Sequence, residues 1–298
     1  MKINLTNYGI DRMIKITVLG GSGFLGSHLC ELLSEKNFIV TIFDKNKSRY
    51  KNKKQRFIKG DILDKKALSK AIKGADYVFN FAGAANMDYL KFDPMKTVKY
   101  NILGTVNALE ISSKFKIKKF IHASTIYANT EEGGFYGRSK KAAEDYVEEF
   151  KKKYNLNFTI LRFGSIYGPR AGLDNGVRQI LENVLFRKRL IYKGTRNSIR
   201  RYIYVKDAAK LSLQSLSKKY NNKYLVITGA KKIKANYFFK ILSNLFNIRR
   251  KKIIYLKNKG HYDIKPTLFK PRSGKILFPK NENFKFNIVD YGNKIKKL

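Results

Sequence analysis

The chain has 298 residues, 43% of them hydrophobic and 13% aromatic, which is enough to form the core of about two domains. A single cysteine excludes a disulfide framework or a cysteine-rich metal site, and three histidines are too few for a histidine-rich one, so we expect no bound metal. No apolar run reaches the roughly 18 residues of a membrane span, and the N-terminus lacks the apolar stretch of a signal peptide. We therefore expect a cytoplasmic protein with no membrane span.

The formal net charge is +41, from 63 Lys and Arg against 22 Asp and Glu. Such an excess is typical of proteins that bind nucleic acid or anionic membranes, but it also arises when exposed positions default to lysine. Here 48 of the basic residues are lysines and 15 are arginines, spread over the whole length, whereas nucleic-acid sites concentrate arginine on one face. We expect no nucleic-acid partner, while an anionic small-molecule substrate fits the same charge.

Strand and helix patterns alternate along the first half of the chain. Runs of β-branched and apolar residues predict strands at 14–18, 38–43, 56–58, 77–81, 120–123 and 158–162. Apolar residues at helical spacing predict helices near 25–36, 65–72, 97–114 and 139–153. This alternation predicts an α/β fold with a doubly wound parallel sheet of the Rossmann type.

A glycine motif, Gly20-x-x-Gly23-x-x-Gly26, lies between the first predicted strand and the first predicted helix. In this context the glycines allow a tight turn, a close approach of the backbone to a pyrophosphate and close packing of helix on strand. The N-terminus of the helix then offers free N–H groups to phosphates. The motif predicts a dinucleotide site, and the alternative is a merely flexible turn.

Two acidic residues follow the next strands. Asp44 ends the second strand, 18 residues after Gly26, where a carboxylate accepts hydrogen bonds from ribose hydroxyls and repels a 2′-phosphate. It therefore predicts NAD rather than NADP, a preference that the nearby Lys45, Lys47 and Arg49 would weaken. Asp61 follows the third strand, where it would contact adenine or, alternatively, cap the next helix. Cys30, within the first helix, is expected to be a small packed apolar residue.

A candidate catalytic pair stands at the start of a predicted helix. Tyr136 and Lys140 are four residues apart, which places them on one face. A nearby ammonium group lowers the pKa of a phenol, so Tyr136 is expected to act as a base. The preceding strand delivers Ser124 and Thr125, whose hydroxyls either bond a substrate oxygen or simply cap the strand. Counting from the strand favours Thr125.

With these motifs in order, the chain resembles the extended short-chain dehydrogenase/reductases of the NAD-dependent epimerase/dehydratase family, which act on nucleotide sugars. The resemblance runs from about residue 13 to residue 229 and is looser beyond. Further segments that carry it are residues 80–83 (Asn-Phe-Ala-Gly), Asn101 with Gly104 and Thr105, residues 161–170 and residues 200–207.

The resemblance implies NAD as cofactor, a nucleotide-sugar substrate and a homodimer. It implies cofactor contacts from Gly20, Gly23, Phe24, Leu25, Gly26, Asp44, Asp61, Ile62, Phe81, Ala82, Gly83, Asn101, Tyr136 and Lys140. It implies substrate contacts from Thr125, Ser165, Arg200 and Arg201, with Arg200 favoured over Arg201 for the diphosphate. Residues 1–164 would form the Rossmann domain, and residues 165–298 mainly a smaller substrate-binding lobe from which about 202–229 return to the sheet.

Within this family the residues favour an epimerase. Tyr136 would remove a sugar hydroxyl proton while hydride passes to NAD and returns to the other face of the keto-sugar. Thr125 would bond the reacting oxygen, and Lys140 would hold the nicotinamide ribose. A dehydratase or decarboxylase needs a carboxylate just after the hydroxyl residue, and none follows Thr125 before Glu131. The alternatives are a reductase or dehydrogenase of the same family that releases its cofactor, and a catalytically silent dinucleotide-binding protein.

Overall fold

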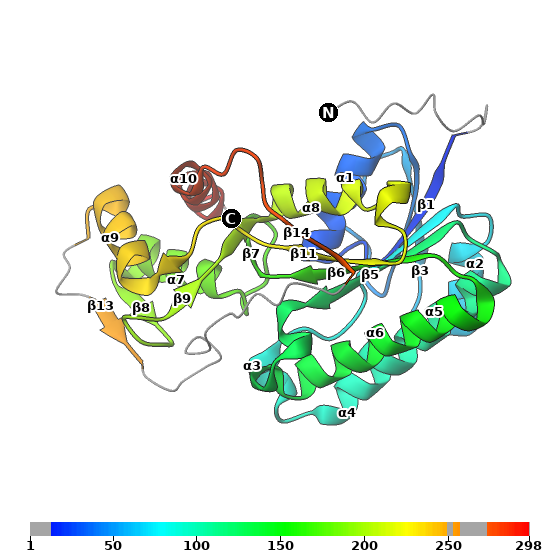
Figure 1. Cartoon of the computed structure of the whole chain (residues 1–298). Helices are drawn as coiled ribbons and strands as arrows, with labels where there is room; N and C mark the ends of the chain where they lie inside the picture. Colours follow the sequence, from blue (N-terminus) through cyan, green and yellow to red (C-terminus); the bar gives the residue numbers. More distant parts are fainter. Residues whose placement is uncertain (1–12, 249–252, 257–272, 298) are drawn as a thin grey trace.

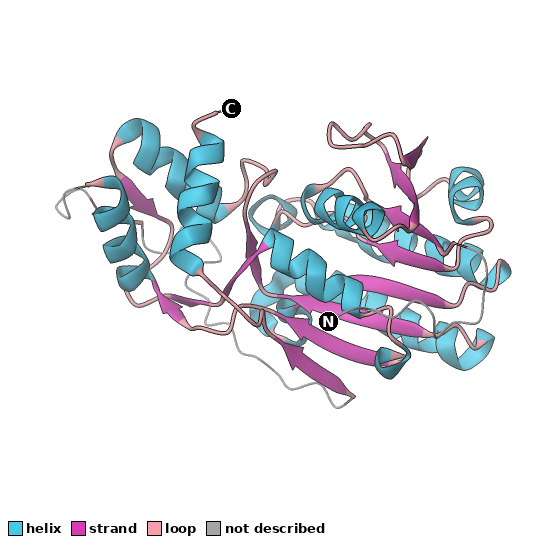
Figure 2. Cartoon of the chain, turned by 90° about the horizontal axis from the view of Figure 1, so that it is seen from above, coloured by secondary structure: helices cyan, strands magenta, loops and turns pink. Residues whose placement is uncertain are grey.

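An eight-stranded sheet, parallel throughout, lies at the centre of the larger lobe (Figures 1 and 2). The computed structural model describes residues 13–248, 253–256 and 273–297. The strand order is β14-β11-β6-β5-β4-β1-β2-β3. The strands are β1 (Lys15–Leu19), β2 (Ile39–Asp44), β3 (Gln55–Lys59), β4 (Tyr77–Asn80), β5 (Lys119–Thr125), β6 (Phe158–Phe163), β11 (Lys223–Ile227) and β14 (Gly274–Leu277). The order reverses at β1, which places a binding crevice at the carboxyl ends of β1 and β4.

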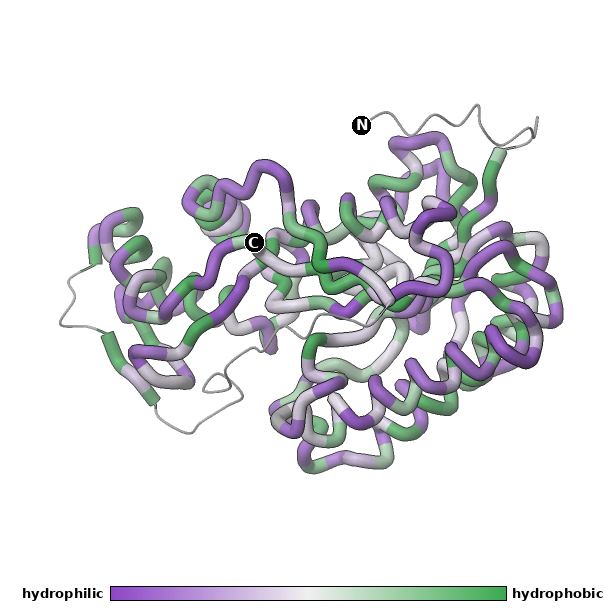
Figure 3. The backbone as a smooth tube through the Cα atoms, viewed as in Figure 1, coloured by the Kyte–Doolittle hydropathy of each residue, from purple (hydrophilic) through white to green (hydrophobic). Residues whose placement is uncertain are grey.

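Helices cover both faces of this sheet, as the predicted fold class requires. On one face α1 (Phe24–Glu35) packs beside α8 (Val205–Gln214), and on the other lie α2 (Lys65–Ile72), α5 (Gly104–Lys114) and α6 (Gly134–Tyr154) (Figure 1). The strands are largely apolar, whereas α5 and α6 alternate hydrophilic and hydrophobic residues because only one side of each meets the sheet (Figure 3). The prediction of a doubly wound α/β fold is confirmed.

The predicted elements differ from the observed ones mainly before α5 and α6. The helix predicted over 97–114 is three pieces: α4 (Pro94–Thr97), a π-helical turn η2 (Val98–Leu103) and α5. The helix predicted from residue 139 begins at Gly134, so Tyr136 lies in its first turn. Two short 3₁₀ turns, η3 (Ile126–Asn129) and η4 (Glu131–Gly133), link β5 to α6.

The smaller lobe has its own core, rich in aromatic rings. It contains β7 (Ser165–Tyr167), α7 (Gly176–Arg187), β8 (Leu190–Tyr192), β9 (Ile199–Arg200), β10 (Tyr202–Tyr204), β12 (Ile233–Lys234), α9 (Ala235–Phe246), β13 (Ile253–Tyr255) and α10 (Phe284–Ile295). The rings of Tyr167, Tyr202, Phe238 and Phe284 lie 5.4–6.2 Å apart at its centre. Of the stretch expected to return to the sheet, α8 and β11 join the larger lobe, while β10 pairs with β7. No pattern in the sequence predicted that β14 would join the large sheet beside β11.

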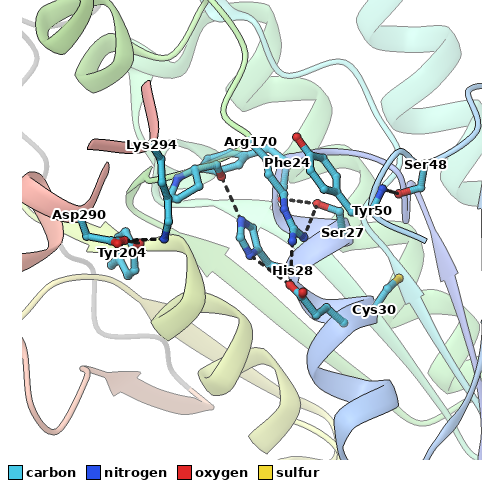
Figure 4. A network of polar contacts seen from close by, with 12 residues as sticks. Phe24, Ser27, His28, Cys30, Ser48, Tyr50, Arg170, Tyr204, Asp290 and Lys294 are labelled. Carbon is cyan, nitrogen blue, oxygen red and sulfur yellow. Dashed lines mark hydrogen bonds and ion pairs between the residues drawn. The ribbon is translucent and has the colours of Figure 1, made fainter. Parts of the chain in front are cut away.

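Polar contacts tie α1 to the segment that enters the smaller lobe (Figure 4). His28 Nε2 lies 3.0 Å from the carbonyl oxygen of Pro169. Arg170 donates to Glu31 at 2.8 Å, and its guanidinium lies 3.9 Å from the ring centre of Tyr50. Burial lowers the pKa of His28 to about 4, so this imidazole is neutral at pH 7. These contacts fasten α1 to the segment that follows β7. In the described part of the chain, no helix is long and apolar enough to cross a membrane.

A buried lysine joins β5 to the end of α8. The ammonium group of Lys119 donates to the carbonyl oxygens of Ser215, Leu216 and Ser217 at 2.8, 3.3 and 2.9 Å. Lys119→Met should lower the free energy of unfolding by about 1–3 kcal/mol, because buried carbonyls lose their donor. Urea denaturation measures this. The exposed Lys114→Met is the control, with a change within about 0.5 kcal/mol, and equal stability of the two variants would contradict the prediction.

Candidate active site

A first cavity of about 290 Å³ opens at the carboxyl ends of β1, β2 and β4. Seven residues predicted to contact the cofactor line it: Gly20, Gly23, Asp44, Ile62, Phe81, Ala82 and Gly83. The other lining residues, which were not predicted as cofactor contacts, are Phe43, Lys45, Gly60, Ala84, Lys96 and Tyr100. The glycine motif and the strand-end acid therefore meet in one site, as their spacing indicated.

Two glycines of the motif are required by geometry. Gly20 has φ +77°, and a Cβ there would lie 2.6 Å from the backbone nitrogen of Ala82. A Cβ at Gly26 would lie 2.2 Å from the carbonyl oxygen of Gly20, so α1 packs directly against the turn after β1. Helix α1 begins after Gly23, which provides no side-chain cap. The first N–H groups of α1 are thus available to an anion at this turn.

Asp44 faces the glycine turn. Its carboxylate accepts hydrogen bonds from the backbone N–H groups of Ser22 and Asn46, both at 3.1 Å. The neighbouring Lys45 pairs with Asp61 at 2.8 Å and donates to the Tyr100 hydroxyl at 3.0 Å. The ammonium group of Lys45 is therefore bound to Asp61 and Tyr100 rather than to Asp44.

The proposed alternative role of Asp61 as a helix cap is wrong. Asp64, three residues later, accepts from the N–H groups of Lys66 and Ala67 and caps α2. Asp61 instead accepts from the N–H of Leu63 at 3.0 Å and pairs with Lys45.

A second cavity of about 390 Å³ adjoins the first, and Phe81 and Gly83 line both. It lies between the lobes, since its wall combines residues of β5 and α6 with residues of β7, α7 and β9. The predicted residues that line it are Phe24, Phe81, Gly83, Ser124, Thr125, Tyr136, Lys140, Ser165 and Arg200. The candidate catalytic groups and two of the candidate substrate ligands therefore share one space beside the glycine turn.

Tyr136 and Lys140 both have shifted acidities. Burial raises the pKa of Tyr136 to about 12, while a hydrogen bond with the Thr125 side chain opposes the rise. The expectation that Lys140 depresses this pKa is therefore not met in the structure, where burial of the phenol dominates. Burial also lowers the pKa of Lys140 to about 8, and the charge of Glu144 opposes that change. The Lys140 amine donates to the carbonyl oxygen of Ala123 at 3.1 Å.

The two candidate hydroxyls at the end of β5 have different partners. Thr125 is hydrogen bonded with Tyr136 and also accepts from the N–H of Tyr127 at 3.3 Å. The Ser124 hydroxyl donates instead to the buried carboxylate of Glu144 at 2.6 Å. Of the two, Thr125 thus has the position that a partner of Tyr136 in catalysis requires.

Five predicted residues line neither cavity. Leu25 packs against the core, and Gly26 lies beneath the glycine turn. Asn101, within η2, exchanges hydrogen bonds with the backbone of Ala84 and donates to Ser139 at 2.9 Å, so it supports the wall from behind. Asp61 pairs with Lys45, as described above. Arg201 donates to the carbonyl oxygens of Gly229 and Ala230 outside the second cavity.

Several cavity residues had no sequence prediction: Asn86, Met87, Asp88, Asp174 and Asn175. Asn86 caps α3 (Met87–Leu90) and Asn175 caps α7, and a capping asparagine after a strand is a signal that could have indicated these loops. The assumption that no carboxylate lies near the hydroxyl residue also needs correction. Asp88, in α3, and Asp174, in the loop before α7, line the same cavity as Thr125 although they are distant from it in sequence. Among the described residues, no group of three or more His, Cys, Asp or Glu side chains could hold a metal ion.

A parallel doubly wound sheet, a glycine turn with a strand-end acid, and a Tyr–Lys pair in an adjoining cavity define a dinucleotide-dependent enzyme of the short-chain dehydrogenase/reductase type. Residues 16–227 match the NAD dependent epimerase/dehydratase family. The chain belongs to this family, and the predicted family and the expectation of an enzyme are confirmed.

Individual relatives agree with this placement. The chain is 30% identical to a putative UDP-glucose 4-epimerase of Methanocaldococcus jannaschii, over 88% of this chain and 87% of the relative. It is 29% identical to a dTDP-D-glucose 4,6-dehydratase of Dictyostelium discoideum, over 65% of this chain and 53% of the relative. The crystal structure of UDP-glucose 4-epimerase with UDP-glucose from Thermotoga maritima superposes with a TM-score of 0.81 at 27% identity, covering 95% and 99% of the two chains.

Proposed function

We propose that this protein is a cytoplasmic, NAD-dependent nucleotide-sugar epimerase that oxidises its substrate transiently to a keto-sugar and reduces it on the other face. The observation that carries the proposal is that the two cavities adjoin each other. Thr125, Tyr136 and Lys140 lie in one, the glycine turn and Asp44 lie in the other, and Phe81 and Gly83 belong to both.

The first cavity fits NAD. The backbone at Gly20 can approach a pyrophosphate because no Cβ stands there, and the open N-terminus of α1 suits its charge. Asp44 is placed at the end of β2 to accept the ribose hydroxyls. When bound, NAD supplies a reversible hydride acceptor.

The remaining chemistry belongs to the residues of the second cavity. Tyr136 exchanges a proton with the sugar hydroxyl, and Thr125, already bonded to Tyr136, holds the same oxygen. Lys140 provides a positive charge beside them and holds the nicotinamide ribose. Arg200, 2% exposed and lining the cavity, binds the diphosphate, and Ser165 contacts the substrate nearby.

The test is incubation of the purified protein with a panel of nucleotide sugars and identification of the products by NMR. The expected product is an epimer, with NAD retained by the protein after gel filtration. Release of reduced cofactor would indicate a reductase instead, and the absence of turnover on every sugar would indicate a silent dinucleotide-binding protein. Formation of CO₂ or a 4-keto-6-deoxy sugar would contradict the proposal, and Asp88 would then be the first carboxylate to replace.

Thr125 and Ser124 should differ in their effect on turnover. Thr125→Val is expected to lower kcat at least about tenfold, because a hydrogen bond to a reacting oxygen is lost. Ser124→Ala, the matched loss of a hydroxyl one residue away, should lower kcat less than Thr125→Val, since Ser124 donates to Glu144. Steady-state kinetics of both variants measures this, and the opposite ranking would transfer the catalytic role to Ser124.

Arg200 should act on substrate affinity alone. Arg200→Ala is expected to raise KM for the nucleotide sugar about tenfold, because a charge-assisted contact with the diphosphate is lost. Calorimetric titration with NAD should give the wild-type Kd. The neighbouring Arg201→Ala is the control, since its guanidinium bonds Gly229 and Ala230 outside the cavity. A weaker affinity for NAD in Arg200→Ala would place Arg200 in the cofactor site.

We also propose that the protein is a homodimer. Exposed apolar side chains gather on α4, η2 and α6, which contact one another: Met95, Val98, Leu103, Tyr146 and Tyr154. A surface of this kind is typical of an interface. Light scattering after gel filtration tests the proposal, and a monomer at micromolar concentration would contradict it.

A further inference from the structure

A buried carboxylate lies behind the candidate catalytic residues and has no part in the reaction described above. Glu144, on α6, is fully buried and stands four residues after Lys140. Its Oε1 accepts from Ser124 at 2.6 Å and from Nε of Arg162 at 2.8 Å, and its Oε2 accepts from a terminal nitrogen of Arg162 at 2.6 Å. Glu144 therefore joins α6 to β5 and β6 directly below the second cavity.

Arg162, the ion-pair partner of Glu144, does not line the second cavity. The Arg162 guanidinium lies 4.4 Å from the ring centre of Tyr224 on β11 and also donates to Asn129 at 3.4 Å. A buried ion pair of this kind adds little net stability, because desolvation of the two charges offsets their attraction. Its location at the active site thus suggests a role beyond holding the fold together.

The charge of Glu144 affects the protonation of Lys140, one turn earlier on α6. The Lys140 side chain is buried, which lowers its pKa to about 8, and the charge of Glu144 opposes this shift. His122 on β5 also lies near Lys140, but burial and the Lys140 charge lower the pKa of this imidazole, so it is neutral. The Lys140 charge acts on His122 of β5, and the Glu144 charge acts on Arg162 of β6 and Tyr224 of β11. Glu148, one turn after Glu144 on α6, acts on Arg162 and Tyr224, and Tyr136, one turn before Lys140, lines the same cavity as Lys140.

We propose that Glu144 is a positioning residue whose negative charge stabilises the ammonium form of Lys140, while its Oε1 holds the Ser124 hydroxyl away from the substrate and so leaves Thr125 as the partner of Tyr136. The inference rests on the proposed function, in which Lys140 acts in its charged form. Loss of the Glu144 charge alters the pH range of activity rather than the affinity for substrate.

The first test is the pH dependence of kcat in Glu144→Gln. Glutamine keeps an oxygen that accepts from Ser124 but removes the charge, so the alkaline limb of the profile should move to lower pH. We expect kcat at pH 9, relative to pH 7, to be about tenfold lower than in the control, with KM unchanged. The control is Glu148→Gln, the same change one turn further along α6, where the carboxylate bonds the Tyr224 hydroxyl at 2.7 Å.

The second test reports on Lys140 without turnover. Acetic anhydride reacts with neutral amines, so its rate of reaction with Lys140 in the cofactor-free protein, mapped by mass spectrometry across pH, gives the midpoint of this titration. The midpoint should fall in Glu144→Gln and stay at the wild-type value in Glu148→Gln. Because an unpaired Arg162 can destabilise the fold, the double variant Glu144→Gln/Arg162→Gln is measured too. It removes both charges of the pair, so its midpoint should fall less than that of Glu144→Gln but stay below the wild-type value.

The outcomes separate this inference from the proposed function. Equal midpoints in the wild type, Glu144→Gln and the double variant would overturn the role of Glu144. A lowered midpoint supports that role even if no nucleotide sugar is turned over, in which case the proposed function alone fails.

Discussion

Tyr136→Phe is expected to abolish the proposed epimerisation, with kcat at least about 10²–10⁴-fold below the wild-type value, because the hydroxyl to which we assign exchange of the substrate proton is lost. The ring of Tyr136 and its packing remain, so the melting temperature and the Kd for NAD should stay near wild-type values. Steady-state kinetics, thermal denaturation and calorimetric titration with NAD provide the three measurements.

The control for this variant is Tyr127→Phe, which removes a second phenol hydroxyl from the same cavity. We expect its kcat to fall less than about tenfold, since no proton transfer depends on it. Wild-type turnover by Tyr136→Phe, or an equal loss in both variants, would remove Tyr136 from the mechanism.

Asp44 should set the choice of cofactor. At an effective dielectric constant of about 20, a carboxylate and a 2′-phosphate about 5 Å apart repel by about 3 kcal/mol, so NAD should bind roughly 10²-fold more tightly than NADP. Asp44→Asn removes this repulsion and leaves Lys45 and Lys96 in the same cavity, so the difference should narrow to within about tenfold. Calorimetric titrations with both dinucleotides measure the two ratios.

Asp64→Asn is the matched control, because it removes the same charge while asparagine still caps α2. Its cofactor preference should equal that of the wild type. Equal affinity of the intact protein for NAD and NADP would show that Asp44 does not discriminate. In that case the Lys45 amine, paired here with Asp61 and Tyr100, would be the next group to change.

The sequence predicts well those parts of the site that depend on local pattern. The glycine turn and Asp44 were predictable because the spacing of a strand, a turn and a helix fixes where each lies at the sheet edge. Tyr136 and Lys140 face one cavity because four residues make about one helical turn. Cys30 is buried as expected, and burial raises the pKa of its thiol.

Features that depend on contacts distant in sequence were not predictable in this way. Counting from the strand favours Thr125 over Ser124, but the partner of Ser124 was not predictable, because Glu144 reaches β5 from the second turn of α6 after Tyr136. Asp88, in α3, and Asp174, in the loop before α7, line the cavity because tertiary packing brings these distant segments to it. Strand β14 has only four residues, and its place beside β11 follows from the sheet edge left open there.

The smaller lobe is built from three separate stretches of chain, which carry β7 to β10, β12 to β13, and α10. The stretches between them belong to the larger lobe: α8 and β11 lie between the first two, and β14 lies between the last two. No single contiguous segment of the sequence therefore encodes the whole smaller lobe, so substrate preference cannot be exchanged by replacing one segment. A recombination event that replaced everything after β6 would also exchange two strands of the shared sheet, and the new strands would have to match β6 in register. Specificity in this chain is consequently expected to diverge by point substitutions around the interlobe cavity, and chimeras with relatives should fold only when β11 and β14 are kept with their native neighbours.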